Sequence, residues 1–436
     1  MQKPLLAMLI GSAMLTMNAQ AADLLQVYQQ ALANDATYAS ARAALAAGQE
    51  RSTQGRSQLL PVIGLGGSSS KTTGDFDTKN PLNPDRALDS SNNKYAIQLT
   101  QPLFRWDRWE SYQQSKLSEA VSEAQFAQAQ QDLIVRVSQA YFDVLTSQDA
   151  LTSIQAQKTA TTEQLASAKR NFEVGTQTIT DTHEAQAAYD LVVAQEFAAQ
   201  SDLEVKRAAL QQIIGKPAGS LASLRTGVKI SAPEPATMEP WVSSAEQQNY
   251  GVVGAQLNVE IAKREINRQR AGHLPTLDLT ASKGRDSTTG FGINKANQVG
   301  VTWSVPIFSG FAITSKVRES IALEDKARND LEATRRAAAQ GARQAYLGVN
   351  SGLAQVRALE AAEVSSKSAL ESNKLGYQVG VRINIDVLNA QRQLYSTQRD
   401  LSRARYETLM NGLRLKSAAG SLKEADLAPI NALLQN

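Results

Sequence analysis

Apolar residues recur at threes and fours over the longest uninterrupted stretch of the chain. Between residues 106 and 171 they repeat at helical spacing, and neither proline nor glycine interrupts the segment. This period is typical of an α-helix with coiled-coil character. At about 1.5 Å per residue, such a helix would be roughly 100 Å long. Residues 181–214 repeat the pattern and meet a stop signal at Gly215 and Pro217. Helices of this length do not pack into one globule, so they predict a tube or a coiled coil.

A period of two marks four shorter segments. Apolar and polar positions alternate in residues 60–70, 95–100, 274–283 and 298–305. These segments read as strands, and most approach the roughly 9–11 residues of a tilted transmembrane strand. Polar, turn-rich residues 71–94 and 284–296 read as loops between paired strands. Pro102 is expected to end the second strand, because proline cannot donate to a ladder.

The order of these elements occurs twice. Repeated landmarks are Leu60 and Leu274, Phe104 and Phe308, Gln139 and Gln344, and Gly175 and Gly380. The last two pairs are each 205 residues apart, which predicts an internal duplication. The expected parts are a signal peptide (1–21), a first repeat (22–217), a linker (218–240), a second repeat (241–419) and a tail on the helices (420–436). Each repeat reads as helix, two strands, a very long helix, a tip and a second long helix, with residues 24–54 as the first helix.

The strands constrain any membrane-bound form. Beyond the N-terminal segment, no apolar run nears the roughly 18 residues that a spanning helix needs. A membrane sheet must close on itself, because lipid tails cannot hydrogen-bond the unpaired backbone groups of an open sheet edge. Four strands are too few to enclose an interior. Two, three or four chains together would supply eight, twelve or sixteen strands, and strand number alone leaves these open.

Composition and charge narrow the function. Lys3, an apolar run and Ala19-Gln20-Ala21 predict an exported chain cleaved after Ala21. The sequence contains no cysteine, which excludes disulfides, thiolate metal sites and a lipid-anchoring cysteine. A formal net charge of +3, with charges spread along the chain, argues against nucleic-acid binding.

Two copies of one helix-turn-helix tip separate the long helices. Val-Gly pairs at 174–175 and 379–380 are each followed by an aspartate that opens the next helix, Asp181 or Asp386. Residue type alone favours an N-cap role for both aspartates. Glu184, three residues after Asp181, has the spacing of a capping box.

Trp106 and Trp109 stand where the second strand gives way to a helix. They fit an aromatic belt at a membrane interface. They also fit aromatic packing at a strand-helix corner. The second repeat has Phe308 and Phe311 at this place, so both interpretations stay open.

The signal peptide, the duplicated module, the Pro-x-Phe strand exits and the Val-Gly tips resemble TolC-type outer-membrane channel proteins. The resemblance covers essentially the whole mature chain. It implies an α+β fold and a homotrimer, in which a 12-stranded transmembrane β-barrel continues into a long periplasmic α-helical barrel. The implied partners are outer-membrane lipid, a periplasmic adaptor protein and an inner-membrane ABC or proton-driven transporter. Without a lipidation cysteine, the chain looks more like the type I secretion branch.

The same resemblance implies a periplasmic gate. Arg382 would bond Asp181 or Thr180 of a neighbouring helix pair, and Tyr377 would add a hydrogen bond. Val174, Gly175, Val379 and Gly380 would form the adaptor-docking tips. Of two acidic rings in the pore, the first would be Asp386, whereas the second falls on Asn389, which lowers the expected constriction charge from six carboxylates to three. Asp386 and Asn389 share a helix face, and carboxylates around a narrow pore would attract cations.

Catalytic chemistry is not indicated. His183 and His273 lie in different halves, no nucleophile elbow occurs, and no cofactor or metal is expected. We therefore carry two hypotheses. The first is a passive outer-membrane exit duct for protein secretion or multidrug efflux. The second is a soluble periplasmic coiled-coil adaptor or scaffold with a small β-domain.

Overall fold

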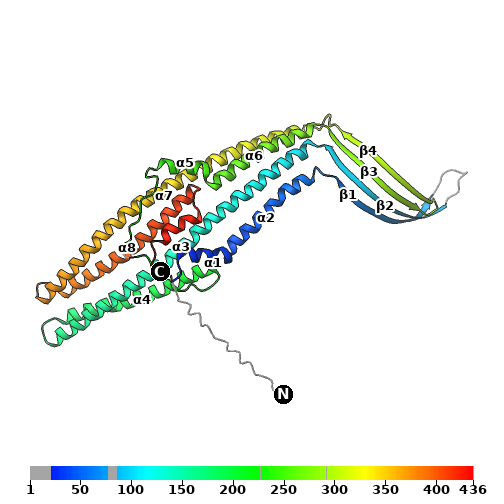
Figure 1. Cartoon of the computed structure of the whole chain (residues 1–436). Helices are drawn as coiled ribbons and strands as arrows, with labels where there is room; N and C mark the ends of the chain where they lie inside the picture. Colours follow the sequence, from blue (N-terminus) through cyan, green and yellow to red (C-terminus); the bar gives the residue numbers. More distant parts are fainter. Residues whose placement is uncertain (1–20, 77–85, 226, 291, 436) are drawn as a thin grey trace, which may run out of the picture. The chain divides into compact units, whose positions relative to one another are not determined.

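The computed structural model describes residues 21–76, 86–225, 227–290 and 292–435. The predicted signal peptide lies outside these residues, apart from Ala21. None of the described helices is long and apolar enough to cross a membrane. The helices and strands appear in Figure 1.

The chain divides into two compact units, and both repeats contribute to each. The first unit contains residues 1–39, 130–242 and 341–436, and the second contains 40–129 and 243–340. In order, the elements are α1 (Leu24–Asn34), α2 (Ala36–Ser57), β1 (Val62–Phe76), β2 (Arg86–Phe104), α3 (Trp106–Glu173), α4 (Ile179–Ile214), α5 (Glu239–Gln248), α6 (Tyr250–Arg270), η1 (Ala271–His273), β3 (Thr276–Thr288), β4 (Gly292–Ser304), α7 (Ala312–Gln378), α8 (Asn384–Ala418), η2 (Glu424–Asp426) and α9 (Leu427–Asn431).

The long helices follow the predicted pattern closely. The segment 106–171, expected to be one helix, lies within α3. Gly215 caps α4 in the left-handed conformation, with φ of 73°, as the glycine stop signal predicted. The helix expected over 24–54 is instead broken at Asp35, whose carboxylate accepts a hydrogen bond from Tyr38 N at 2.6 Å. Asp35 therefore ends α1 and caps the start of α2.

The core of the first unit is built from α1, α3, α4, α8 and the C-terminal tail. Tyr141 is fully buried and donates through its hydroxyl to the Ala222 carbonyl oxygen at 2.7 Å. Phe142 stacks on Tyr406 with ring centroids 5.6 Å apart. Leu427 of the tail is also fully buried in this cluster. The tail therefore takes part in the core of this unit.

The second unit contains one antiparallel sheet in the order β1-β2-β3-β4. Its strands are longer than the period-two pattern predicted. Pairing continues to Phe76 opposite Arg86, and to Thr288 opposite Gly292. The predicted loops 71–94 and 284–296 are therefore partly wrong, because backbone pairing does not need apolar side chains. Pro102 does not end β2 either: a register irregularity between Pro102 and Phe104 lets the strand continue.

The register sorts the sheet into two chemically different faces. Side chains alternate across a strand, so residues paired in register share a face. The face that we call the apolar face contains Ile63, Leu65, Ile97, Leu99, Leu277, Leu279, Ala281, Val299, Val301 and Trp303. The opposite face is mostly glycine, serine, threonine and glutamine. Several apolar-face side chains are strongly exposed, among them Val299 at 76% and Trp303 at 71%.

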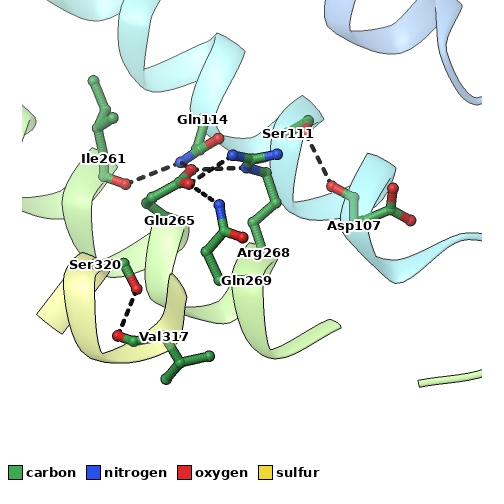
Figure 2. A network of polar contacts seen from close by, with 9 residues as sticks. All are labelled: Asp107, Ser111, Gln114, Ile261, Glu265, Arg268, Gln269, Val317 and Ser320. Atoms are coloured by element: carbon green, nitrogen blue, oxygen red, sulfur yellow. Dashed lines mark hydrogen bonds and ion pairs between the residues drawn. The ribbon is translucent and has the colours of Figure 1, made fainter. Parts of the chain in front are cut away.

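Polar contacts hold the strand-helix junction within this unit. Arg105 makes two hydrogen bonds to the Asp278 carboxylate, at 3.0 and 2.5 Å. Figure 2 shows a second group, in which Arg268, Gln114 and Gln269 all donate to Glu265. Burial alone would raise the pKa of Glu265, but these bonds outweigh it and lower the pKa to about 2. The junction is therefore held by a charged network that stays ionised in mild acid.

Candidate functional site

The first tip turns on a glycine in the left-handed region. After α3 ends, Gly175 has φ of 76° and donates its N–H to the Phe172 carbonyl oxygen at 2.9 Å. Thr176 N donates to the Asn171 carbonyl oxygen at 2.9 Å. These bonds satisfy carbonyl groups that the end of α3 would otherwise leave free. A side chain at Gly175 would be strained by the positive φ.

Asp181 acts in a capping box that starts at Thr178. Thr178 is the N-cap of α4, and its hydroxyl donates to the Asp181 carboxylate at 2.8 Å. The same carboxylate accepts from Thr178 N at 3.1 Å. The predicted N-cap role of Asp181 is therefore wrong, as is its box with Glu184. Asp181 supplies the third-position acceptor instead, because Thr178 occupies the cap.

The second tip repeats the turn with a different cap. Gly380 has φ of 78° and donates its N–H to the Tyr377 carbonyl oxygen at 3.2 Å. The N-cap of α8 is Ile383, which makes no side-chain hydrogen bond. Asp386 lies in the first turn of α8, so its predicted N-cap role is also wrong. Its carboxylate lies 3.7 Å from Arg382 Nη1, in a partly exposed ion pair.

Two hydrogen-bonded links join the tips. Tyr377 donates its hydroxyl to Gln177 Oε1 of the first tip at 2.7 Å. Asn384 is fully buried, donates to the Asp181 carbonyl oxygen at 3.0 Å and accepts from Gln164 Nε2 at 2.6 Å. Tyr377 is among the residues predicted from the sequence, whereas Gln177 and Asn384 are not. No sequence signal marks Asn384, because its burial depends on a partner 220 residues away.

Apolar packing supports the same links. Leu388 of α8 packs with Leu165, Ala168 and Ala185 of α3 and α4. Val387, the next residue of α8, is fully buried in a separate cluster with α7. The first turns of α8 therefore pack against α3 and α4 on one side and against α7 on the other.

The remaining predicted residues are more accessible. Thr180 is exposed, and so are Val174 and Val379 at the turns. Asn389 accepts a short hydrogen bond from Arg392 Nη2. Asn389 and Asp386 line one open groove between α7 and α8. The pairing of Arg382 with Asp181 or Thr180 would involve a neighbouring helix pair, so it stays a prediction.

Trp106 and Trp109 occupy the first turn of α3 and are 42% and 41% exposed. Trp109 makes an edge-to-face contact with Tyr112, with ring centroids 5.9 Å apart. The two tryptophans thus combine packing with an exposed surface. Their role at a membrane interface stays a prediction.

Comparison with known proteins identifies the family. The model of the outer membrane efflux protein family matches residues 27–216 and 241–421. The chain belongs to this family. It is 33% identical to the outer membrane protein TolC of Escherichia coli, over 99% of this chain and 89% of that protein. It is 32% identical to the alkaline protease secretion protein AprF of Pseudomonas aeruginosa, over 98% of this chain and 91% of that protein.

Solved structures of an outer membrane protein and of an outer membrane channel share the fold. The Vibrio cholerae outer membrane protein VceC superposes with a TM-score of 0.78 at 18% identity, over 91% of this chain and 96% of that one. The Campylobacter jejuni outer membrane channel CmeC superposes with a TM-score of 0.79 at 19% sequence identity, over 94% of this chain and 89% of that one. The predicted α+β fold, TolC-type family and outer-membrane location are confirmed. The exit duct is thus the function that the family supports, in preference to the soluble adaptor.

The family consists of channel proteins. Within the described part of the chain, no group of three or more histidine or acidic side chains could hold a metal ion. At the tips, Asp181 takes part in a capping box, and Arg382 and Asp386 form an ion pair.

Proposed function

We propose that three copies of this chain form an exit duct for type I protein secretion, multidrug efflux or both. Their sheets together make a 12-stranded transmembrane β-barrel, and their long helices make a periplasmic α-helical barrel. The duct is passive and has no enzymatic activity or cofactor. A periplasmic adaptor and an inner-membrane ABC or proton-driven transporter dock at the tips and drive transport.

The observation that carries this proposal is the two-faced sheet. One face presents apolar side chains to lipid, and the other presents small polar side chains suited to a water-filled interior. Among the described strands, β1 and β4 each pair along one edge only. A membrane sheet needs both edges paired, and pairing β4 of one copy with β1 of the next satisfies them.

The tips supply a lock that docking can release. The Arg382–Asp386 ion pair is 59% and 34% exposed, and exposed pairs contribute at most about 1 kcal/mol. Arg382 can therefore exchange Asp386 for Asp181 or Thr180 of a neighbouring pair at little cost. Tyr377–Gln177 and the Asn384 link keep the two tips of one chain together in the closed state.

The two sequence repeats are part of this proposal. The family model matches two segments, 27–216 and 241–421. These segments support the proposed repeats at 22–217 and 241–419, with a linker at 218–240 and a tail at 420–436. One ancestral module used twice would account for two similar tips in each chain.

Single-channel recording in planar bilayers tests the proposed gate. Arg382→Ser should raise the closed-state conductance several-fold, and Asp386→Ala should abolish block by multivalent cations. Arg336→Ser, which removes a more exposed arginine paired with Glu332 at 2.7 Å, should change neither. Unchanged conductance and block in both gate variants would refute the gate. Recovery of the chain in the soluble periplasmic fraction would refute the duct itself.

A further inference from the structure

The apolar face of the sheet becomes basic toward the hairpin ends of β3 and β4. Lys283, Arg285 and Lys295 follow the apolar rows on this same face, and all three are exposed. Arg285 pairs in register with Lys295, and Lys283 is two residues from Arg285 along β3. We call these three residues the basic cluster.

The charge of the basic cluster is not balanced within the sheet. Lys71 lies 3.3 Å from Asp89, and Lys94 lies 3.4 Å from Asp286. By contrast, no ion pair among the described residues involves the basic cluster. Like charges directly opposite each other in an antiparallel pair are destabilising. An exposed arrangement of this kind is therefore suited to an anionic ligand.

The surroundings indicate which anion. Tyr95, 62% exposed, pairs in register with Arg285 from the β2 side. Tyrosine is enriched where the apolar surface of a membrane barrel meets the headgroups. From Val299 to Ile307, every second residue of the chain is apolar and at least 40% exposed.

The apolar row lies on the part of β4 that is farther from the hairpin, and it continues past the end of that strand. Within β4, the row from Val299 to Trp303 spans about 13 Å at about 3.3 Å per residue, and Val305 and Ile307 continue it beyond the end of the strand. The basic cluster therefore begins where the apolar row ends, on the side of the sheet away from the helices that follow β2 and β4.

We propose that the basic cluster binds the phosphate groups of an anionic lipid in the outer leaflet, with the acyl chains of that lipid on the apolar rows beside it. Arginine suits phosphate because its fork can donate two parallel hydrogen bonds. A free phosphate would use only the cations, whereas a phosphorylated glycolipid uses the cations and the apolar rows together. This inference rests on the proposed placement of the sheet in the membrane.

The experiment uses the full-length trimer in detergent and in vesicles. Lipid A with both phosphates is the probe, the same lipid without phosphates is the comparison, and affinity is measured by native mass spectrometry. The wild type should prefer the phosphorylated lipid at least tenfold. Lys283→Ser/Arg285→Ser/Lys295→Ser should remove at least tenfold in affinity, since the variant loses all three basic side chains that attract the anionic headgroup.

Matched variants separate charge from folding. Arg285→Lys/Lys295→Arg keeps the charge and should keep most of the affinity. Lys71→Ser removes a paired lysine from the same face and should leave affinity unchanged. Wild-type affinity in the triple variant, equal loss in Lys71→Ser, or displacement of the lipid by millimolar inorganic phosphate would each overturn the inference. Failure of the wild type to float with vesicles would instead overturn the membrane placement and, with it, the proposed function.

Discussion

The first and second tips share a turn and differ in the cap that follows it. Gly175 and Gly380 are 205 residues apart, and both have a positive φ. At the same spacing, Thr178 corresponds to Ile383 and Asp181 corresponds to Asp386. In the first tip the carboxylate is held by the hydroxyl and N–H of the cap residue. In the second tip the cap offers no hydroxyl, and the carboxylate pairs with Arg382 instead.

This difference shows how a duplicated segment acquires two roles. The aspartate occupies the third position of its helix in both copies, where a negative charge also favours the helix dipole. What it does next depends on the residue three positions earlier. Threonine fixes the carboxylate within its own helix, whereas isoleucine leaves it free for a cation. The first tip is therefore suited to a fixed part and the second to an exchangeable one.

The largest effect is expected where the two tips meet. Asn384→Ala should leave Gln164 and the Asp181 carbonyl without their partner, at a cost of about 2–3 kcal/mol for buried polar groups. Hydrogen exchange should show the free energy of opening both tips falling by that amount. Asn329→Ala, which removes an exposed asparagine bonded to the Asp325 carbonyl oxygen at 2.8 Å, should change little. If Asn384→Ala accelerated hydrogen exchange in only one tip, Asn384 would not be a link shared by both tips.

At the strand-helix junction, protonation of Glu265 should lower the stability of the protein without opening the tips. The pKa of Glu265 falls from 4.5 to about 2 on folding, so its contribution is complete above about pH 4.5 and is lost as the pH falls toward 2. Because its side chain is 27% exposed, we expect about 1–2 kcal/mol after allowance for screening.

Thermal unfolding at pH 6 and pH 3 measures this effect. Glu265→Gln should lower the midpoint at pH 6 and flatten the change between the two values. Glu332→Gln, in an exposed ion pair on α7, should retain the wild-type dependence on pH. A higher single-channel conductance in Glu265→Gln at pH 6 would contradict the assignment of the gate to the tips.

Sequence reasoning succeeded where one local signal decided the structure. The span of α3 followed from an unbroken apolar period, and both turns followed from glycine. It failed where the outcome depended on distant partners. The polar ends of β1 to β4 carry no period-two signal, yet their backbones pair across the hairpins. The role of Asn384 depends on its hydrogen bond from Gln164. The role of Asp386 depends on Ile383, an N-cap residue that makes no side-chain hydrogen bond.

A smaller effect should distinguish the two caps directly. Thr178→Ala removes the hydroxyl that holds Asp181, and loss of an N-cap costs about 1 kcal/mol. Hydrogen exchange in the first turn of α4 should become faster by about fivefold. The matched change in the second tip, Ile383→Ala, removes no capping hydroxyl and exposes little, since Ile383 is already 61% exposed. Equal acceleration at both helix starts would show that the caps do not differ as described.

The smallest effect comes from converting the second tip to the first. Ile383→Thr would give α8 a capping hydroxyl three residues before Asp386, worth about 0.5 kcal/mol. The carboxylate would then be divided between the cap and Arg382. A double-mutant cycle of Arg382→Ser and Asp386→Asn measures their coupling, with hydrogen exchange at the tip as the readout. The coupling should be smaller with threonine at 383 than with isoleucine, and the conductance of the closed channel should rise slightly because the lock is weakened. An unchanged coupling would mean that the carboxylate of Asp386 is oriented by something other than its cap, and the contrast between the two tips would lose its physical basis.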